Sequence, residues 1–432
     1  MMLAGRDVAE WTEQARARTL ILLDETDDVL AEVPLLPTVN PPLWEICHAV
    51  FFREHHVLRG ALGRESMLPR SDEALDSLLI AHEARWRVEL LPRDRIRAYV
   101  NDVTDAVLDA LSGTSDERLI YLAAWAVFHE DMHWEAIAAT RQAMGHPAPS
   151  AFGAPRGEAP PADCGGRAED LLVPGGEFLL GAAPDGPFAF DNEKWAHPVT
   201  LAPFAISSRA VTEGEFAAFV LDGGYERREF WDDLGWAFRQ AVGAERPLYW
   251  LRVGKEEFLV RRFDRLEPLR PERAVSHVSF HEAQAFCRWA GRRLPTEAEW
   301  EAAACGLGAA GGKRRRPWGD HPNTGREANL DGWSGGAVDV SLHPAGDSPF
   351  GCRQMLGNVW EWTSTTFEPY PGFEPDMYAE FSRPCFHTRK VLRGGCWATT
   401  SRQVWNTLRN FYQPTRRDIF AGFRTCPLAE DV

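Results

Sequence analysis

The chain has 432 residues, which is too long for one ordinary hydrophobic core, so two or three domains are expected. Hydrophobic residues make up 44% of the chain and charged residues 25%, which is typical of a soluble globular protein. The formal net charge of −16 argues against nucleic acid as the main partner, because phosphate binding requires a basic face, and no apolar run is long enough to predict a membrane span.

The first 148 residues predict a bundle of antiparallel helices. The N-terminal segment is polar and helical in pattern, without the apolar core of a signal peptide. Short connections between amphipathic helices favour an antiparallel bundle. Apolar residues recur at helical spacing in five segments, 9–33, 43–62, 75–91, 93–113 and 116–145.

The last of these segments contains the clearest functional signal, His129-Glu-Asp-Met-His-Trp-Glu135. His129 and His133 are four residues apart, so on a helix they share one face and can reach one metal ion. The pair alone is a weak signal, because buried histidines often only satisfy a hydrogen bond. At this point zinc, iron and a structural role all remain open.

The chain changes character after the bundle. Residues 149–170 are rich in Pro, Ala and Gly and predict a linker. Residues 171–432 alternate short β-like runs with two helical segments, 211–224 and 279–291, between long loops. This pattern predicts an α+β domain stabilised by side-chain packing. Eight scattered cysteines without a Cys-x-x-Cys pair favour reduced thiols, as in a cytoplasm, over a disulfide framework.

A series of motifs in the second region resembles the formylglycine-generating-enzyme/sulfatase-modifying-factor superfamily, which has a C-type-lectin-like fold. Most of these residues are structural in that superfamily, and Trp360 and Trp362 are expected in the core. The motifs are Pro174-Gly-Gly-Glu-Phe178, Asp191-Asn-Glu-Lys194, His197-Pro-Val199, Val211-Thr-Glu-Gly-Glu-Phe216, Val278-Ser-Phe-His-Glu-Ala283, Gly291-Arg-Arg-Leu-Pro-Thr-Glu-Ala-Glu-Trp300, Pro317-Trp-Gly319, Gly357-Asn-Val-Trp-Glu-Trp-Thr363, Arg393-Gly-Gly395 and Gly422-Phe-Arg424.

The first region resembles the DinB-like four-helix fold, whose members bind a divalent metal through three histidines. Leu43-Trp-Glu-Ile-Cys-His48 places His48 where these proteins carry the third histidine. A DinB-like bundle followed by a formylglycine-generating-enzyme-like domain is the architecture of the sulfoxide synthases of ergothioneine and ovothiol biosynthesis and of the related selenoneine synthase. The resemblance covers nearly the whole chain and predicts this two-domain fold.

The resemblance implies that His48, His129 and His133 hold Fe(II), with open positions for substrate and O2. The alternative ligand set is His129, His133 and Glu135, a two-histidine, one-carboxylate triad. We prefer three histidines, with Glu135 orienting a ligand imidazole from outside the coordination sphere. Glu130 has the same option or faces solvent. The other bundle histidines, expected at the surface or in packing, are His55, His56 and His82.

The same resemblance implies an activity. In these enzymes the C-terminal domain holds the histidine betaine hercynine, and iron couples a sulfur or selenium nucleophile to the imidazole carbon between the two nitrogens, using O2. A metal is needed because that carbon is not electrophilic and O2 is spin-inert without one. The expected partners are therefore hercynine, a chalcogen donor and O2, and the expected state is a monomer or a weak homo-oligomer.

The chain departs from the ergothioneine synthases that use γ-glutamylcysteine. Met132 stands where those enzymes carry a Gln that contacts hercynine. Asn410 is kept, and Phe411 replaces a Trp but still offers a ring face to a trimethylammonium group. Tyr412 replaces an Asp, so the carboxylate that would pair with a substrate ammonium is missing, while Arg416 remains at the position of a substrate-binding Arg.

These departures indicate a different chalcogen donor. Tyr412 and Gln413 offer hydroxyl and amide groups, which suit a neutral polyhydroxyl ligand such as a sugar. A selenosugar donor is therefore favoured, and cysteine or γ-glutamylcysteine is the alternative. The segments that look like the selenoneine synthase branch are His129-Glu-Asp-Met-His133, Thr140-Arg-Gln142, Ala81-His-Glu-Ala-Arg-Trp86 and Phe423-Arg-Thr-Cys426.

Two further residue roles are implied by the resemblance. Arg85 and Arg87 lie where the ergothioneine enzymes place a substrate-binding Arg on a bundle helix, and Arg85 is preferred; the alternative is a solvated face. A Tyr on a loop after Trp-Glu-Trp-Thr serves as general acid in these enzymes. Tyr370 and Tyr378 are the candidates, and Tyr378 is chosen.

Other functions fit the sequence less well. A formylglycine-generating oxidase would need a pair of close cysteines after Arg393-Gly-Gly395, but only Cys396 occurs between Arg393 and Arg424. A DinB-like zinc thiol transferase would use the three histidines without needing the second domain. A non-catalytic lectin-like binding module would not need the histidines.

Overall fold

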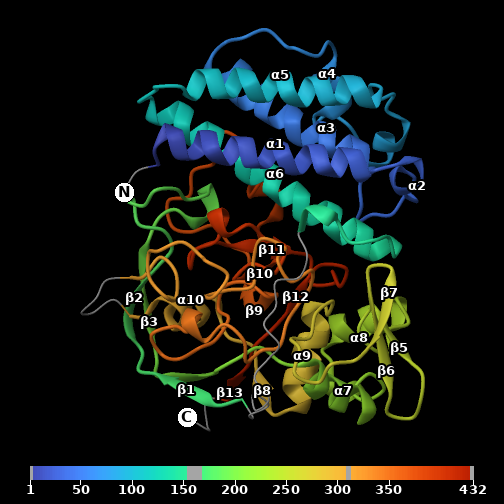
Figure 1. Cartoon of the computed structure of the whole chain (residues 1–432). Helices are drawn as coiled ribbons and strands as arrows, with labels where there is room; N and C mark the ends of the chain where they lie inside the picture. Colours follow the sequence, from blue (N-terminus) through green and yellow to red (C-terminus); the bar gives the residue numbers. More distant parts are fainter. Residues whose placement is uncertain (1–2, 153–167, 308–312, 429–432) are drawn as a thin grey trace. The chain divides into compact units, whose positions relative to one another are not determined.

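A computed structural model describes residues 3–152, 168–307 and 313–428 of the chain. These residues form two compact units, drawn in sequence colours in Figure 1. The first unit comprises Met1–Ala151 together with Asp185–Phe188, and the second comprises Phe152–Pro184 and Ala189–Val432. Within the described ranges, no helix is both long and apolar enough to cross a membrane.

Four long helical segments make up the first unit. They pack as α1 against α5 and α6, and α3 against α6 and α5, which is the arrangement of a four-helix bundle. The π-helical turn η1 continues α3 directly. The elements are α1 (Gly5–Glu25), α2 (Asp28–Ala31), α3 (Pro42–Arg53), η1 (Glu54–Ala61), α4 (Ser71–Leu75), the 3₁₀ turn η2 (His82–Arg87), α5 (Arg93–Leu111) and α6 (Glu117–Met144).

The longest helix, α6, has clear start and stop signals. The Asp116 side chain accepts hydrogen bonds from the backbone N–H groups of Arg118 and Leu119, which satisfies otherwise unpaired donors at the N-terminus. Gly145 ends the helix with a φ of 70°, the left-handed conformation that glycine adopts without strain. Alanines and larger apolar residues are buried along α6, as expected for a helix in a bundle core.

The helix predicted over 75–91 is wrong. The chain leaves α4 at Leu75, and only the 3₁₀ turn His82–Arg87 is helical beyond it. Asp76 explains the break: its carboxylate accepts from the N–H of Leu78, a local side-chain-to-backbone bond that competes with a helix. Leu78 and Leu79 are 49% and 67% exposed, so their apolar character does not mark a buried face.

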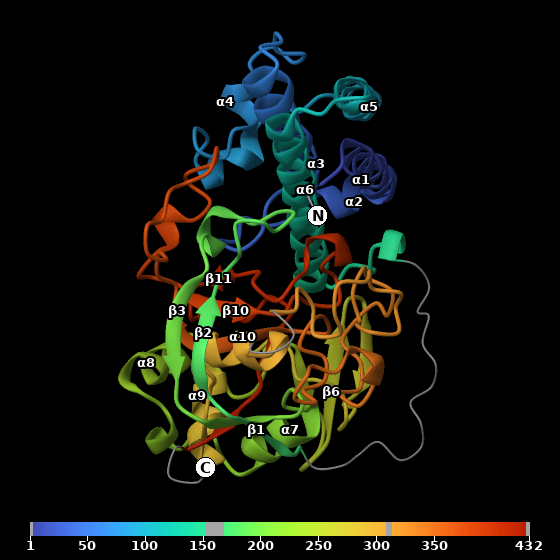
Figure 2. The same cartoon turned by 90° about the vertical axis from the view of Figure 1, so that its left-hand side faces the viewer.

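Among its described residues, the second unit has short strands in five small sheets. The largest has the order β11-β10-β9-β12, in which β10 is antiparallel to both neighbours and β12 is parallel to β9. The view in Figure 2 shows β2 and β3 lying side by side as a pair. The strands are β1 (Asp170–Val173), β2 (Gly176–Leu180), β3 (His197–Leu201), β4 (Phe204–Ser207), β5 (Trp250–Arg252), β6 (Phe258–Arg262), β7 (Arg265–Pro268), β8 (Arg292–Arg293), β9 (Trp360–Thr366), β10 (Lys390–Arg393), β11 (Asn410–Tyr412), β12 (Ala421–Gly422) and β13 (Cys426–Pro427).

Four helices accompany these strands: α7 (Glu213–Leu221), α8 (Asp233–Ala241), α9 (Phe280–Trp289) and α10 (Glu297–Cys305). The predicted helical segments 211–224 and 279–291 contain α7 and α9, whereas α8, α10 and the β5-β6-β7 sheet were not predicted. Capping boxes begin α7, α9 and α10, because a Thr or Ser and the Glu three residues later exchange hydrogen bonds with the backbone.

The core of the second unit combines large aromatic side chains with paired charges. Trp360 and Trp362 are 4% and 0% exposed, so both lie in the core as predicted. The guanidinium of Arg424 is buried against the carboxylate of Glu361, with an Nε–Oε2 distance of 2.6 Å. Side-chain packing thus supports the long loops.

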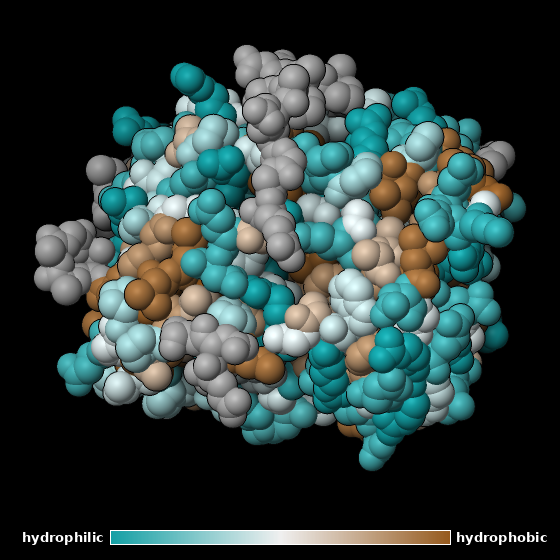
Figure 3. Space-filling model, turned by 90° about the horizontal axis from the view of Figure 1, so that it is seen from below, coloured by the Kyte–Doolittle hydropathy of each residue, from teal (hydrophilic) through white to brown (hydrophobic). Residues whose placement is uncertain are grey.

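Seen from below, hydrophobic residues form separate surface patches among hydrophilic ones (Figure 3).

Two sequence predictions, the linker and the reduced cysteines, involve residues that the structure describes only in part. Most of the predicted linker, residues 153–167, lies outside the described residues, as does Cys164. The seven cysteines that the structure describes are all free, and six of them are buried. The predicted absence of a disulfide framework agrees with these seven thiols.

Candidate metal centre

Three histidines from two helices meet in the core of the first unit. His129 and His133 project from one face of α6, and their Nε2 atoms are 3.2 Å apart. His48 on α3 completes the cluster, with ring centroids 5.2 Å and 4.8 Å from those of His129 and His133. One nitrogen from each residue lies within 4.8 Å of the other two. The structure therefore brings together the three residues that the sequence suggested as ligands.

Hydrogen bonds define which nitrogen of two of these rings faces the cluster. Nδ1 of His48 lies 2.7 Å from the backbone carbonyl oxygen of Leu75, so it carries the proton and donates. Nδ1 of His133 lies 2.8 Å from a carboxylate oxygen of Glu45. Both tautomers leave the Nε2 lone pair available to a metal ion.

Glu45 was not predicted as a site residue. It is 1% exposed and lies three residues before His48 on α3, so the two side chains share a helix face. The spacing Glu-x-x-His within residues 45–48 was the sequence signal for it. The Glu45 carboxylate contacts the imidazole of His133, and the ligand-orienting role suggested for Glu135, which is half-buried, stays a prediction.

Burial affects the protonation of two of the three histidines. It lowers the pKa of His48 and of His129 well below the ordinary histidine value, and the neighbouring His133 adds to the effect in both cases. Both rings are therefore neutral near pH 7, which is the form that binds metal ions. Three imidazoles clustered in this way fit a divalent first-row metal such as iron or zinc.

Aromatic rings enclose the cluster on two sides. Trp44 is stacked on His48, with centroids 4.9 Å apart and planes within 6°. Phe52 is stacked on His129 at 3.7 Å and 13°. These contacts restrict the orientation of both imidazoles, and a rigid donor set is what a metal site requires.

The other bundle histidines serve in packing, as expected. His55 lies 3.5 Å from Asp72 at the surface of the unit, and the ring of His56 packs against that of Phe52 in a tilted arrangement, with centroids 4.2 Å apart. His82 bonds the carbonyl oxygen of Val39 at 2.8 Å. Glu130, for which a ligand-orienting or solvent-facing role was open, is buried and forms an ion pair with Arg53.

Arg85 lies on the 3₁₀ turn η2 rather than on a bundle helix. Its guanidinium donates to Oδ1 of Asn40 at 2.8 Å and to the carbonyl oxygen of Ser77 at 3.3 Å. It also lies over the ring of Trp44, 4.4 Å from the centroid. Arg87 is exposed, so Arg85 is the one of the pair that faces into the unit.

The substrate residues predicted in the second unit lie on and after β11. Phe411 is stacked on Phe367, with centroids 4.0 Å apart, and Phe381 meets it edge-on at 5.5 Å. The side-chain oxygen of Asn410 accepts from the N–H of Phe411 at 2.8 Å. Tyr412 is half-buried beneath the guanidinium of Arg416, at 5.0 Å. One face of the Phe411 ring is thus used in packing.

Arg416 is already engaged within the chain. Its guanidinium donates two parallel hydrogen bonds to the carboxylate of Asp418, from Nε and from an Nη atom, both at 2.6 Å. This bidentate pair contributes to a raised pKa of the guanidinium despite its burial. A substrate carboxylate would therefore have to compete with Asp418 for Arg416.

The two candidate tyrosines differ in their surroundings. Tyr370 is buried, its hydroxyl lies 3.2 Å from a carboxylate oxygen of Glu297, and the guanidinium of Arg409 lies 4.1 Å from its ring centroid. Burial raises the pKa of Tyr370 well above the ordinary value. Tyr378 is half-buried. Tyr378 as the general acid stays a prediction, with Tyr370 as the alternative.

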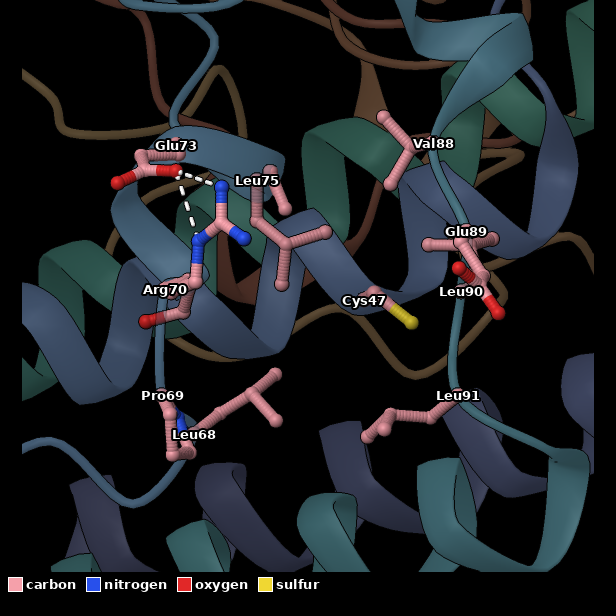
Figure 4. Close-up of a pocket in the computed structure, with 12 residues that line it drawn as sticks. Cys47, Leu68, Pro69, Arg70, Glu73, Leu75, Val88, Glu89, Leu90 and Leu91 are labelled. Carbon is pink, nitrogen blue, oxygen red and sulfur yellow. Dashed lines mark hydrogen bonds and ion pairs between the residues drawn. The ribbon is translucent and has the colours of Figure 1, made fainter.

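A cavity of about 430 Å³ lies beside α4, and the three histidines are not among the residues that line it. Figure 4 shows Cys47, Leu75 and Leu91 around this cavity, with the Arg70–Glu73 ion pair at one edge. The Leu75 side chain lines the cavity while its carbonyl oxygen holds His48. The cavity is therefore a neighbour of the histidine cluster, not a part of it.

Comparison with known families identifies both parts of the chain. Residues 12–137 match the DinB superfamily, and residues 156–427 match the sulfatase-modifying factor enzyme 1-like domain. The hercynine oxygenase of Mycolicibacterium thermoresistibile is 38% identical over 435 residues, covering 99% of this chain and 95% of its own. The hercynine oxygenase of Mycobacterium tuberculosis is 38% identical over 435 residues, with full coverage of both chains.

The chain belongs to the hercynine oxygenase family. The predicted architecture, a DinB-like helical bundle followed by a formylglycine-generating-enzyme-like domain, is confirmed. A formylglycine-generating enzyme of Streptomyces coelicolor is also similar, at 34% identity over 284 residues, but it covers only 59% of this chain and 86% of its own. The hercynine oxygenases match this chain over 99% or more of its length, whereas this formylglycine-generating enzyme matches 59% of it.

Proposed function

We propose that this chain is a nonheme iron enzyme in which His48, His129 and His133 hold Fe(II). The observation that carries the proposal is the cluster of three imidazoles from α3 and α6, with one nitrogen of each within 4.8 Å of the others. When bound, iron would supply O2 activation at positions that the three histidines leave open. Glu45 and the carbonyl of Leu75 hold two of the imidazoles in the tautomer that such binding requires.

The proposed reaction joins a chalcogen atom to the imidazole carbon of hercynine. The names of the full-length relatives, hercynine oxygenases, support hercynine as the substrate. In the overall balance, the C–H and chalcogen–H bonds break and a carbon–chalcogen bond forms. One oxygen atom of O2 leaves as water with the two hydrogens, and the other stays on the chalcogen as an oxide.

A selenosugar is proposed as the donor, and the surroundings of Arg416 support it. Asp418 already neutralises this guanidinium, so a donor with a free carboxylate gains less there. Tyr412 supplies a hydroxyl group instead of the carboxylate that would pair with an ammonium group. A neutral donor with hydroxyl groups matches both features better than γ-glutamylcysteine does.

The metal site is tested by replacing one ligand. His129→Ala is expected to lose stoichiometric Fe(II) after anaerobic loading and desalting, together with hercynine-dependent O2 uptake. His55→Ala is the control, because His55 lies in the same unit but outside the cluster. A His129→Ala protein with full iron occupancy and unchanged turnover would refute the assignment.

The donor is tested by anaerobic binding titrations in the presence of hercynine. Selenosugar is expected to bind more tightly than cysteine or γ-glutamylcysteine. Asp418→Asn should raise the affinity for γ-glutamylcysteine, because it releases Arg416 to a substrate carboxylate. Tightest binding of γ-glutamylcysteine by the unmodified chain would instead establish an ergothioneine sulfoxide synthase.

A zinc-dependent thiol transferase is the alternative of another class, because three clustered imidazoles also suit zinc. Metal identity separates the two proposals. Activity with zinc, without iron-dependent O2 uptake, would favour the transferase. A non-catalytic binding module would show hercynine binding without any turnover.

A further inference from the structure

Arg85 lies at one end of a stack that ends on a proposed metal ligand. Its guanidinium is 4.4 Å from the ring centroid of Trp44, and Trp44 is stacked in turn on His48 with planes within 6°. Trp44 is fully buried, and its Nε1–H donates to the carbonyl oxygen of Ala74 at 2.8 Å. The indole is therefore held at both its ring face and its edge.

The same guanidinium begins a second chain of contacts. It donates to Oδ1 of Asn40 at 2.8 Å, and Nδ2 of Asn40 donates to Glu45 over a longer distance of 3.4 Å. The Glu45 oxygen that accepts from Asn40 also accepts from Nδ1 of His133, at 2.8 Å. This second chain ends on another of the proposed ligands.

The chemistry of its two neighbours determines how Asn40 is oriented. A guanidinium can only donate hydrogen bonds and a carboxylate can only accept them. The amide oxygen must therefore face Arg85 and the amide nitrogen must face Glu45, as the contacts show. Asn40 thus accepts a hydrogen bond from a cation and donates one to a carboxylate.

We propose that Arg85 is a positioning residue of the metal centre, which orients His48 through Trp44 and His133 through Asn40 and Glu45. This inference rests on the proposed three-histidine metal site. It differs from the substrate-binding role that the sequence suggested for Arg85. Arg85 touches neither histidine directly, so its removal alters the geometry of the donor set without removing a donor.

Cobalt(II) binding to the full chain tests the proposal, because Co(II) is a stable probe whose visible absorption bands depend on ligand geometry. Arg85→Met and Asn40→Leu are expected to weaken Co(II) binding, by roughly 10-fold each, and to change the band positions. Arg87→Met is the matched control, because Arg87 is exposed two residues away, and it should change neither.

A further variant, Arg85→Lys, separates a change in site geometry from a loss of folded protein. Arg85→Lys keeps a cation near Trp44 but lacks the fork that reaches both Asn40 and Ser77. It should show an intermediate affinity and a shifted spectrum. A change in spectrum is required for support, because a merely structural loss would lower the amount of folded protein without moving the bands.

The outcomes distinguish this inference from the proposed function. If the unmodified chain binds Co(II) and the Arg85 and Asn40 variants show the same affinity and spectrum, Arg85 is not a positioning residue. If those variants only weaken the binding of the chalcogen donor, the substrate role is correct instead. If the unmodified chain binds no Co(II), the metal site itself falls, and this inference falls with it.

Discussion

Arg53 and Glu130 form an ion pair inside the helical bundle, with side chains only 1% and 4% exposed. The Glu130 carboxylate also accepts from the hydroxyl of Thr19, and Arg53 donates to the hydroxyl of Thr104 at 2.9 Å. Glu130 lies on α6, Arg53 on α3, Thr19 on α1 and Thr104 on α5. One buried polar network thus connects all four helices of the bundle, and its member Glu130 is the sequence neighbour of the proposed ligand His129.

Glu130→Gln should strongly destabilise the bundle. The change removes the negative charge and leaves the buried Arg53 guanidinium uncompensated, at a cost of about 3–5 kcal/mol. Denaturant unfolding, followed by circular dichroism, measures the loss. Asp102→Asn, at an exposed position of α5, is the control and should change stability by less than about 0.5 kcal/mol. Equal effects of the two changes would contradict the role of the network.

Tyr378→Phe and Tyr370→Phe should have different effects. If Tyr378 is the acid, Tyr378→Phe lowers kcat by about 10²–10⁴-fold and leaves the melting temperature unchanged. Tyr370→Phe removes the hydroxyl that contacts Glu297, so it costs about 1 kcal/mol of stability and leaves kcat nearly intact. Steady-state kinetics and thermal melts of both variants decide. A large loss of kcat in Tyr370→Phe alone would reverse the assignment.

Phe411→Leu should weaken hercynine binding. The leucine keeps apolar packing against Phe367 but removes the ring face offered to the trimethylammonium group, which is worth about 0.5–2 kcal/mol, or about 2- to 30-fold in affinity. Isothermal titration with hercynine and with histidine provides an internal control. Histidine lacks the trimethylammonium group, so its affinity should change little. Equal losses for both ligands would argue for a packing effect only.

His277 should make the chain sensitive to acid. Burial is the main cause that lowers its pKa from 6.5 to about 3, so the folded state keeps it neutral where the unfolded state protonates it. Unfolding then takes up a proton below pH 6.5, and stability falls with pH over that range, by at most about 1.4 kcal/mol per pH unit. The loss between pH 7 and pH 5 should be about 2 kcal/mol.

His277→Asn tests this prediction, because Asn tolerates the left-handed φ of 62° at this position. Guanidinium unfolding at pH 7 and pH 5 is compared between the two proteins, so that the contributions of all other groups cancel. The variant should lose about 2 kcal/mol less than the unmodified chain. The same pH dependence in both would show that His277 is protonated in the folded state.

Local patterns in the sequence predicted several elements because their causes are local. The four-residue spacing of His129 and His133 places both on one face of any helix. Thr212 and Ser279, each followed three residues later by Glu, mark the starts of α7 and α9. Thr296 and Glu299 begin α10 in the same way, but that helix was not predicted from the sequence.

The segment after α4 shows where local patterns failed. Apolar residues at helical spacing predicted a helix over 75–91, but the Asp76 side chain bonds the backbone of Leu78 and turns the chain. Because the helix ends here, the backbone carbonyl oxygens of Ala74 and Leu75 accept hydrogen bonds from the side chains of Trp44 and His48. Tertiary contacts therefore outweighed a weak helical preference.

The sequence by itself determined the two-domain architecture, the paired histidines of α6 and the candidate third ligand, because repeating patterns and family motifs are written along the chain. Only the tertiary structure decided three contacts. Glu45 bonds to His133, the Arg85 guanidinium lies over the ring of Trp44, and Asp418 forms an ion pair with Arg416. Those relationships depend on which helix faces and loop ends meet after packing. These contacts are determined by the packing of the whole core and not by the spacing of residues within one element.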